Sequence, residues 1–336
     1  MSRAYRDRLV ILESTKGPDG TTRYVDQVVT FADPRFRFRY MSARNLLKRA
    51  DVFHVHWPEV LVRGGSRYET WARCVLLRVA LRVMAWRKTA IVRTLHNLTP
   101  HESGNSHERR ALQLLDDATD LFVTINPVTQ APRDPSVLIP HGHYRDRFAH
   151  FPHSDAVPGR LAYAGIIRPY KGVEQLLRAF RETESPALSL HLVGKPTPEL
   201  RVAIETAAAG DLRIHATFGF VPDEVLVSEL NASTLVCLPY AELHNSGMML
   251  VALSLGRPVL VPDTETTRVL ADEVGDGWVH RFTGELSGDL LEETLDKISA
   301  SPQSGRPRLD DRDWQVVASR YGDAFDAAHR LKYEVR

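Results

Sequence analysis

The chain has 336 residues, more than the roughly 250 to 300 that one hydrophobic core organises, so we expect two domains. It is 43% hydrophobic and 25% charged, with 20 glycines and 20 prolines, which excludes collagen-like, coiled-coil and disordered classes. The 2 cysteines are too few for a disulfide framework or a cysteine-based zinc site. Both lie in apolar runs, which predicts buried, reduced thiols.

The net charge of +1 hides an uneven distribution, because residues 1–157 carry +8 and the remainder −7. A basic first half indicates contact with something anionic: a membrane surface, a phosphorylated ligand or nucleic acid. The alternative is two ordinary solvated surfaces. No apolar stretch approaches the ~18 residues that span a bilayer, and the N-terminus lacks signal-peptide features, so we expect a cytoplasmic protein.

Apolar strand-like runs alternate with helix-period segments, which is the pattern of parallel sheets with crossover helices. The expected strands are 9–12, 52–55, 90–94, 121–124 and 136–139 in the first half, and 161–164, 188–193, 212–216, 234–238 and 258–261 in the second. We therefore predict an α/β protein with two Rossmann-like domains, residues 1–150 and 151–310, whose linker lies within 147–160. A C-terminal helix in 311–336 is expected to pack back on the first domain.

Ligands of doubly wound sheets lie beyond the carboxyl ends of the strands, so the loops there are the candidate site. The loop after the first strand, residues 16–20, matches neither a dinucleotide-binding signature nor a P-loop and is equally consistent with a plain turn. The loops after the next two strands hold His54, His56, Glu59, His96, His101 and Glu102. Their spacing matches no metal signature. Imidazoles suit proton transfer or hydrogen bonding to a sugar, and a purely structural role is the alternative.

Two loops of the second half precede expected helices. Arg168 and Lys171 flank the start of a helix over 173–181, where free amides and the helix dipole favour an anion. We interpret them as a diphosphate cradle, with ordinary surface charge as the alternative. Ser246 and Gly247 precede an apolar helix and would supply a second phosphate contact.

Residues 66–88 form another expected helix, which carries both basic and aromatic side chains. The basic residues Arg67, Arg78, Arg82 and Lys88 project to one side, and Tyr68, Val75, Val79, Val83 and Trp86 fall largely on the other. Such a helix can lie on an anionic membrane surface, unless its apolar side simply faces the sheet.

Together these motifs resemble the GT-B glycosyltransferases, in particular glycosyltransferase family 4 and its relatives. The matching segments are Tyr163-Ala164-Gly165, Arg168, Lys171-Gly172-Val173, Leu190 to Gly194, Ala252, Gly256-Arg257-Pro258-Val259 and Ile139-Pro140-His141-Gly142. The resemblance implies two Rossmann-like domains facing a central cleft, with a nucleotide-sugar donor held mainly by the second and an acceptor mainly by the first. It implies a hexosyltransferase with no cofactor and no metal, since protein cations stabilise the leaving nucleoside diphosphate.

The resemblance also implies roles for individual residues. The residues implied to bind the donor diphosphate are Arg168, Lys171, Ser246 and Gly247. The residues implied to bind the donor sugar or nucleotide are Gly17, Glu242, His244 and Asn245. Those on the acceptor side are His56, Trp57 and His101. The candidates for the catalytic base are His96, Glu59 and Glu102.

One departure concerns stereochemistry. Retaining members of family 4 carry a pair of glutamates at fixed spacing, but here Val251 occupies the second position and Glu242 is one residue out of register. With this departure, the chain resembles bacterial transferases that add mannose from GDP-mannose to lipid-linked oligosaccharides in exopolysaccharide assembly. These transferases include inverting β-mannosyltransferases. An inverting enzyme needs a general base from the first domain, whereas His96 could instead hold the donor sugar of a retaining enzyme.

The leading hypothesis is a cytoplasmic transferase, peripheral on the inner face of the cell membrane, that moves mannose from GDP-mannose to a lipid-linked glycan. Its basic first domain would bind the anionic membrane. The alternatives are a transferase for a soluble natural-product acceptor with another nucleoside-diphosphate sugar, a nucleotide-sugar epimerase, and a non-catalytic sugar-nucleotide-binding subunit. Nucleic-acid binding is not expected, because the positive charges are dispersed and no recognised motif accompanies them.

Overall fold

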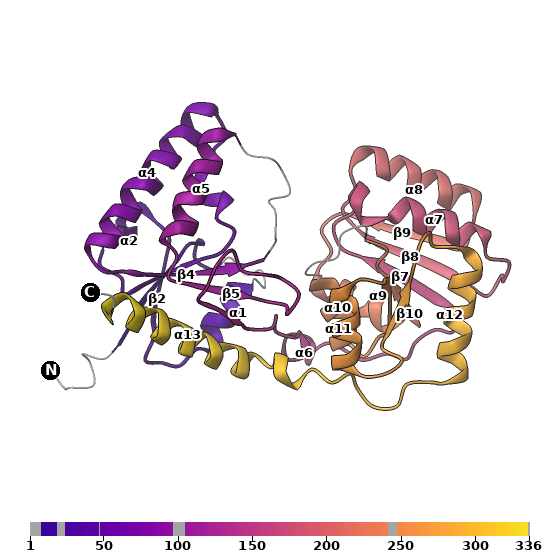
Figure 1. Cartoon of the computed structure of the whole chain (residues 1–336). Helices are drawn as coiled ribbons and strands as arrows, with labels where there is room; N and C mark the ends of the chain where they lie inside the picture. The colour runs from indigo at the N-terminus through magenta and orange to yellow at the C-terminus, as the bar shows by residue number, and fades with distance from the viewer. Residues whose placement is uncertain (1–7, 19–23, 47, 97–104, 241–246, 335–336) are drawn as a thin grey trace. The chain divides into compact units, whose positions relative to one another are not determined.

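The computed structural model describes residues 8–18, 24–46, 48–96, 105–240 and 247–334. The chain divides into two compact units, one of Met1–Gly142 with Asp311–Arg336 and the other of His143–Asp310. Each unit is built on a six-stranded parallel sheet with helices packed on it (Figure 1). The predicted α/β architecture with two Rossmann-like sheets is confirmed.

The first unit has the strand order β2-β1-β3-β4-β5-β6. Its elements are β1 (Val10–Glu13), α1 (Tyr24–Phe31), β2 (Arg37–Tyr40), α2 (Ala43–Leu46), β3 (Val52–Val55), α3 (Glu59–Val62), α4 (Arg67–Trp86), β4 (Ala90–Leu95), α5 (Ser106–Ala118), β5 (Leu121–Thr124), β6 (Ser136–Leu138) and α13 (Trp314–Glu334). Strand β2 was not predicted, because it alternates arginine with aromatic residues and carries no apolar run.

Side chains of the first sheet alternate between two helical layers. Ile11 and Val52 belong to a core shared with α1 and α13, whereas Leu12 and Phe53 belong to a core shared with α4 and α5. These two pairs of helices lie on opposite faces of the sheet (Figure 1). This two-residue alternation decides which polar side chains meet at the carboxyl ends of the strands.

Capping residues set the starts of the two helices on the α4 side. Ser66 accepts a hydrogen bond from the backbone N–H of Glu69 at the first turn of α4. Asn105 and Glu108 form a reciprocal capping box at the start of α5. These hydrogen bonds fix the first turns of α4 and α5.

The C-terminal helix α13 belongs to the first unit. Tyr321 and Phe325 are buried in the core that it shares with α1. At its start, Trp314 packs on the turn at Gly142, where an added Cβ would lie 2.4 Å from the indole. Near its end, Lys332 Nζ lies 3.0 Å from Asp120 Oδ1.

The second unit has the strand order β12-β11-β10-β7-β8-β9. Its elements are α6 (Arg145–Phe148), β7 (Arg160–Ala164), η2 (Pro169–Lys171), α7 (Val173–Glu182), β8 (Ser189–Gly194), α8 (Pro198–Gly210), β9 (Ile214–Phe218), α9 (Asp223–Asn231), β10 (Leu235–Cys237), α10 (Gly247–Ser254), β11 (Val259–Pro262), α11 (Glu265–Val274), β12 (Val279–Phe282) and α12 (Gly288–Ala300), and η3 (Asp310–Arg312) leads into α13. Like β2, the unpredicted β12 is an edge strand with a weak apolar pattern.

The change between units falls at Gly142 and His143, ahead of the linker expected over 147–160. The reason is that α6 already contributes Phe148 to the core of the second unit.

Candidate active site

Polar side chains lie at the carboxyl ends of three neighbouring strands, on the face of the sheet that α1 covers. Glu13 of β1, His54 of β3 and Thr94 of β4 stand two residues after apolar side chains of the same face. His56 and His96 lie just beyond the strand ends. All five are buried, Glu13 and His54 completely. The sequence analysis missed Glu13, although its place two residues after Ile11 in an alternating strand was a usable signal.

One branch of the cluster runs through His54. Its Nδ1 lies 3.1 Å from Glu13 Oε1, and its Nε2 lies 2.9 Å from Thr94 Oγ1. The Thr94 hydroxyl is 2.9 Å from Tyr321 OH, which is 3.1 Å from Tyr24 OH. The phenolic hydroxyls of α13 and α1 therefore cover the cluster on the face of the sheet against which these helices pack.

A second branch runs through His56. Its Nε2 lies 3.2 Å from His54 Nδ1 and 3.5 Å from Glu13 Oε2, and its Nδ1 lies 2.8 Å from His96 Nε2. The Trp57 indole stacks on the His96 ring, with centroids 4.2 Å apart and planes 17° apart. Trp57 has φ of 41°, a left-handed conformation that costs free energy for any residue but glycine. This strained turn holds the indole on His96.

The electrostatics of the cluster favour an ionised Glu13 carboxylate and neutral rings of His56 and His96. Burial raises the pKa of Glu13, but His54 and His56 lower it by more, to about 2. Burial, reinforced by His54, lowers the pKa of His56 to about 4. Burial, reinforced by the neighbouring histidines, lowers the pKa of His96 well below its ordinary value. Near pH 7, His56 and His96 therefore carry one proton each.

Within the described part of the chain, only Glu13, His54 and His56 bring potential metal-ligand atoms together, all within 4.8 Å of one another. A carboxylate and two imidazoles form a ligand set that zinc accepts. However, His54 Nδ1 lies at hydrogen-bond distance from both Glu13 Oε1 and His56 Nε2, and all three side chains are enclosed. The absence of a metal remains a prediction, which chelation can test.

A largely apolar groove of about 600 Å³ opens beside His56 and Trp57 in the first unit. It is lined by residues 14–17 after β1, by Val60 and Leu61, and by Leu76, Leu77 and Ala80 of α4. Gly17, predicted to contact the donor, lies in this groove. The groove therefore joins the polar cluster to the side of α4.

Glu59 starts α3 and is half-buried. Its charge acts on Arg93 of β4, which pairs with Asp116 of α5. Because Arg93 and Thr94 are adjacent in a strand, their side chains point to opposite faces of the sheet. Of the described base candidates, His96 contacts the polar cluster. Glu59 instead lies near Arg93, whose partner belongs to α5. The other candidates in this region, His101 and Glu102, lie outside the described residues.

In the second unit, the loop after β7 carries the predicted anion-binding residues. Arg168 Nη1 donates to the carbonyls of Ile167 at 2.7 Å and Lys195 at 3.1 Å. Lys171 Nζ lies 3.6 Å from the centre of the Tyr240 ring. Burial lowers the pKa of Lys171 to about 8, so this amine is charged at neutral pH but close to its titration.

Two close backbone approaches hold this loop against its neighbours. Gly172 has φ of 68°, and an added Cβ would lie 2.0 Å from the carbonyl oxygen of Pro239. A Cβ at Gly194, which ends β8, would lie 1.8 Å from the carbonyl oxygen of Gly165. A Cβ at Gly165 would in turn be 3.8 Å from Met248 Cε. The start of α10, where Gly247 lies, therefore adjoins the loop after β7, whereas Glu242, His244, Asn245 and Ser246 lie outside the described residues.

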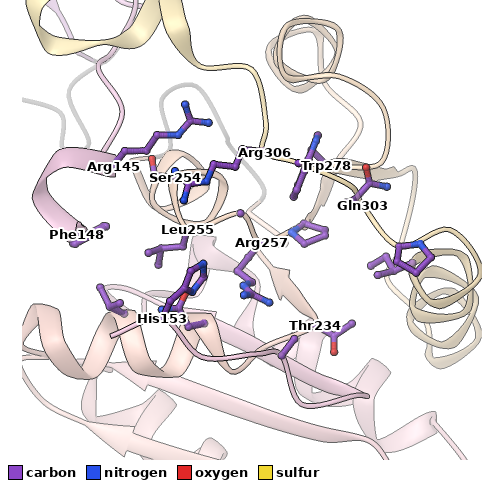
Figure 2. A pocket seen from close by; sticks show the side chains of 18 of the residues that line it. Arg145, Phe148, His153, Thr234, Ser254, Leu255, Arg257, Trp278, Gln303 and Arg306 are labelled. Atoms are coloured by element: carbon purple, nitrogen blue, oxygen red, sulfur yellow. The ribbon is translucent and has the colours of Figure 1, made fainter. Parts of the chain in front are cut away.

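A cavity of about 800 Å³ lies at the edge of the second sheet opposite the loop after β7 (Figure 2). Thr234, Pro258 and Trp278 line it, and each directly precedes a strand. Because the strands are parallel, this is their amino-terminal edge, whereas the loop after β7 lies at the carboxyl edge. The cavity is therefore separate from the predicted donor site.

Helix α4 presents a band of exposed apolar side chains, which we call the α4 surface: Tyr68, Trp71, Leu76, Val79 and Trp86. Tyr68 is 88% exposed and Trp86 is 82% exposed. The residues that face the sheet are instead Cys74, Leu77, Leu81 and Met84. The alternative in which Tyr68, Val79 and Trp86 face the sheet is therefore wrong. Across the described ranges, no helix combines the length and apolarity needed to cross a membrane.

Comparison with known proteins gives the class of protein. Residues 158–291 match the family model described as glycosyl transferases group 1. The fold is similar to that of HepE from Anabaena, solved in complex with UDP, with a TM-score of 0.61, 14% identity, and coverage of 97% of this chain and 98% of HepE. It is also similar to sucrose-phosphate synthase from Thermosynechococcus elongatus, with a TM-score of 0.62, 14% identity, and coverage of 95% and 98%. The two-sheet architecture is that of the GT-B fold.

A more specific similarity comes from sequence. The GDP-mannose:glycolipid 4-beta-D-mannosyltransferase of Xanthomonas campestris pv. campestris is 44% identical over 313 residues, which cover 92% of this chain and 90% of that protein. The chain belongs to the family of this glycosyltransferase. The predicted GT-B hexosyltransferase is thereby confirmed.

Proposed function

We propose that this protein transfers mannose from GDP-mannose to a glycolipid and forms a β-linkage. The observation that carries the proposal is the 44% identity over 92% of the chain to a mannosyltransferase with that donor and acceptor. GDP-mannose is an α-linked donor, so a β-linked product requires inversion at C1. The missing glutamate at Val251, a hallmark of retaining relatives, agrees with inversion.

On the donor side, Arg168 and Lys171 bind the diphosphate at the start of α7. The helix terminus and both cations favour an anion, and the partial burial of Lys171 reduces the screening of its charge by water. They stabilise the charge that develops on the leaving GDP, so no metal is required. Gly247 at the start of α10 adds a second contact, as do Ser246, Asn245, His244 and Glu242.

On the acceptor side, His96 is the general base. The acceptor oxygen attacks C1 of mannose while the bond from C1 to the phosphate oxygen breaks, and the hydroxyl proton passes to His96. A neutral, buried imidazole supports this role because it can accept a proton at physiological pH. His56, Trp57 and His101 position the acceptor, and Glu59 and Glu102 are the competing bases.

The groove beside Trp57 and the α4 surface support a lipid-bearing acceptor. Exposed tyrosine and tryptophan residues of α4 would enter the interfacial region of a bilayer. The exposed Arg67 and Arg82 of the same helix, and Lys88 just beyond its end, would contact anionic head groups. The apolar groove leads from α4 to His56, where the reacting hydroxyl would lie. The enzyme would thus act as a peripheral protein on the inner face of the membrane.

The test is transfer from radiolabelled sugar nucleotides to extracted polyprenyl-linked glycans and, separately, to soluble glycans. We expect label from GDP-mannose to enter the lipid-extractable fraction, with β-configuration at C1 by NMR. The matched control is Lys171→Met, which lacks the donor cation and should lose this transfer. Transfer only from another nucleoside-diphosphate sugar would overturn the proposed donor. Label only in soluble glycans would overturn the proposed acceptor. No transfer in any combination would favour a non-catalytic subunit.

A further inference from the structure

We infer that Glu13 is a positioning residue that acts through His56 to set the tautomer of His96, leaving the proton-accepting lone pair on His96 Nδ1. The inference rests on the proposed role of His96 as a base. The geometry that carries it is the buried chain from Glu13 Oε2 through both ring nitrogens of His56 to His96 Nε2.

The chain starts at a group that can only accept hydrogen bonds. The Glu13 carboxylate is fully buried, and His54 Nδ1 lies 3.1 Å from Oε1. His54 Nδ1 and His56 Nε2 are also 3.2 Å apart, and we assign each a proton directed at its own carboxylate oxygen rather than at the other ring. Among the described atoms, Oε2 has no hydrogen bond of ordinary geometry, and His56 Nε2 lies 3.5 Å from it. A proton on this nitrogen points a positive dipole at the carboxylate, whereas a lone pair there would repel it without water to screen the charge.

The tautomer of His56 then dictates that of His96. With the single proton of neutral His56 on Nε2, its Nδ1 is an acceptor. His96 Nε2 lies 2.8 Å from that atom, and two lone pairs cannot face each other at this distance. His96 Nε2 therefore donates, and the one proton of neutral His96 is on Nε2. The lone pair is on Nδ1.

This assignment matters because a general base needs its lone pair on the reacting nitrogen. The opposite tautomer would carry N–H at Nδ1 and could not take the acceptor proton there. When His96 takes up that proton at Nδ1, it becomes an imidazolium whose Nε2–H still donates to His56 Nδ1. The Glu13 carboxylate stabilises this charge through His56, and the stacked Trp57 keeps the ring plane in place.

The first test is Glu13→Gln, which keeps the size of the side chain but can donate to His56 Nε2 and so favours the opposite tautomers. We expect kcat to fall by about 100-fold or more, as for the wrong tautomer in a hydrolase triad, with little change in KM for GDP-mannose. The matched control is Glu108→Gln, another buried glutamate of the same unit, which pairs with Arg63 outside the cluster. Its kcat should stay near that of the wild type. An equal effect of both substitutions on kcat would overturn the inference.

The second test needs no substrate. In ¹⁵N-histidine-labelled protein, long-range ¹H–¹⁵N spectra distinguish the two tautomers, and the His96 signals are assigned by their loss in His96→Asn. We expect an Nε2–H tautomer for His96 in the wild type and in Glu13→Asp, and a shift toward Nδ1–H in Glu13→Gln. An Nδ1–H tautomer in the wild type overturns the inference even if Glu13→Gln fails to fold, and so does an unchanged tautomer in a folded Glu13→Gln. A correct tautomer without mannosyl transfer would instead count against the proposed function.

Discussion

His56 Nδ1 and His96 Nε2 lie 2.8 Å apart inside the first unit, so one of these two nitrogens donates and the other accepts. The pair couples the side chain that we propose as the base to a carboxylate one strand further away. A histidine placed in this way is set for proton transfer by its neighbours, which makes the catalytic candidates distinguishable by mutation.

Replacing His96 should remove the base and leave donor binding intact. We expect His96→Ala to lower kcat by about 100- to 10,000-fold, the usual contribution of general base catalysis, with little effect on the Kd of GDP. Glu59→Gln is the comparison, since Glu59 lies beside Arg93 rather than the histidines. The steady-state kcat values of the two variants decide whether His96 or Glu59 is the base. A larger loss of kcat in Glu59→Gln would transfer the role of base to Glu59.

Donor affinity should fall at alkaline pH because Lys171 loses its charge. The pKa of Lys171 is lowered to about 8 by burial, so the free enzyme holds a charged amine below pH 8 and a neutral one above it. A bound diphosphate favours the charged form, and GDP binding should therefore take up a proton above pH 8. We expect log Kd to rise by up to about one per pH unit there. Calorimetry between pH 7 and 9.5 measures this slope, and Lys171→Met should lack it.

The α4 surface should bind anionic vesicles. Changing Trp71 and Trp86 to serine should weaken binding by about tenfold or more for each side chain that enters the bilayer, because each buried aromatic contributes about 1.5 to 3 kcal/mol. The matched control is Phe220→Ser in the second unit, where the side chain is 84% exposed but lies outside α4. Co-sedimentation with phosphatidylglycerol vesicles gives the comparison. Equal losses in control and α4 variants would place the contact elsewhere.

The turn after β7 should tolerate no side chain at Gly172. Gly172 and Gly256 share φ of 68°, but a Cβ at Gly172 meets the Pro239 carbonyl at 2.0 Å, whereas a Cβ at Gly256 meets nothing within 4 Å. Gly256→Ala should cost only the left-handed conformation, about 1 to 2 kcal/mol of unfolding free energy. Gly172→Ala should cost more and also weaken GDP binding, because Lys171 moves. Urea denaturation of both variants tests the difference, and equal losses would contradict the close packing.

Chelation should leave both stability and donor binding unchanged. GDP at about 100 times its Kd should raise the free energy of unfolding by about 2.7 kcal/mol, with or without EDTA. Thermal unfolding with GDP, UDP and ADP measures the selectivity. If EDTA lowers the melting temperature of the ligand-free protein, then Glu13, His54 and His56 hold a metal after all.

Much of the architecture follows from local patterns in the chain. Apolar runs such as 161–164 and 121–124 predict buried parallel strands because both faces of such strands are covered. The edge strands β2 and β12 were missed because their apolar pattern is weak, whereas the edge strands β6 and β9 were predicted. The loop with Arg168 and Lys171 was also identifiable, since the residues that form it are contiguous and stand directly before a helix.

The tertiary structure alone decided how distant segments combine. Glu13, His56 and His96 lie at or just beyond the carboxyl ends of three strands whose order and register are properties of the sheet, so no spacing along the chain reveals that their side chains meet. Tyr321 joins the cluster only because α13 packs on that face. For α4, composition indicated basic and aromatic residues, but packing decided that Trp86 faces outward. The physical reason is the same in each case: local propensities act between neighbours in the chain, whereas the site depends on contacts that exist only once the strands have paired.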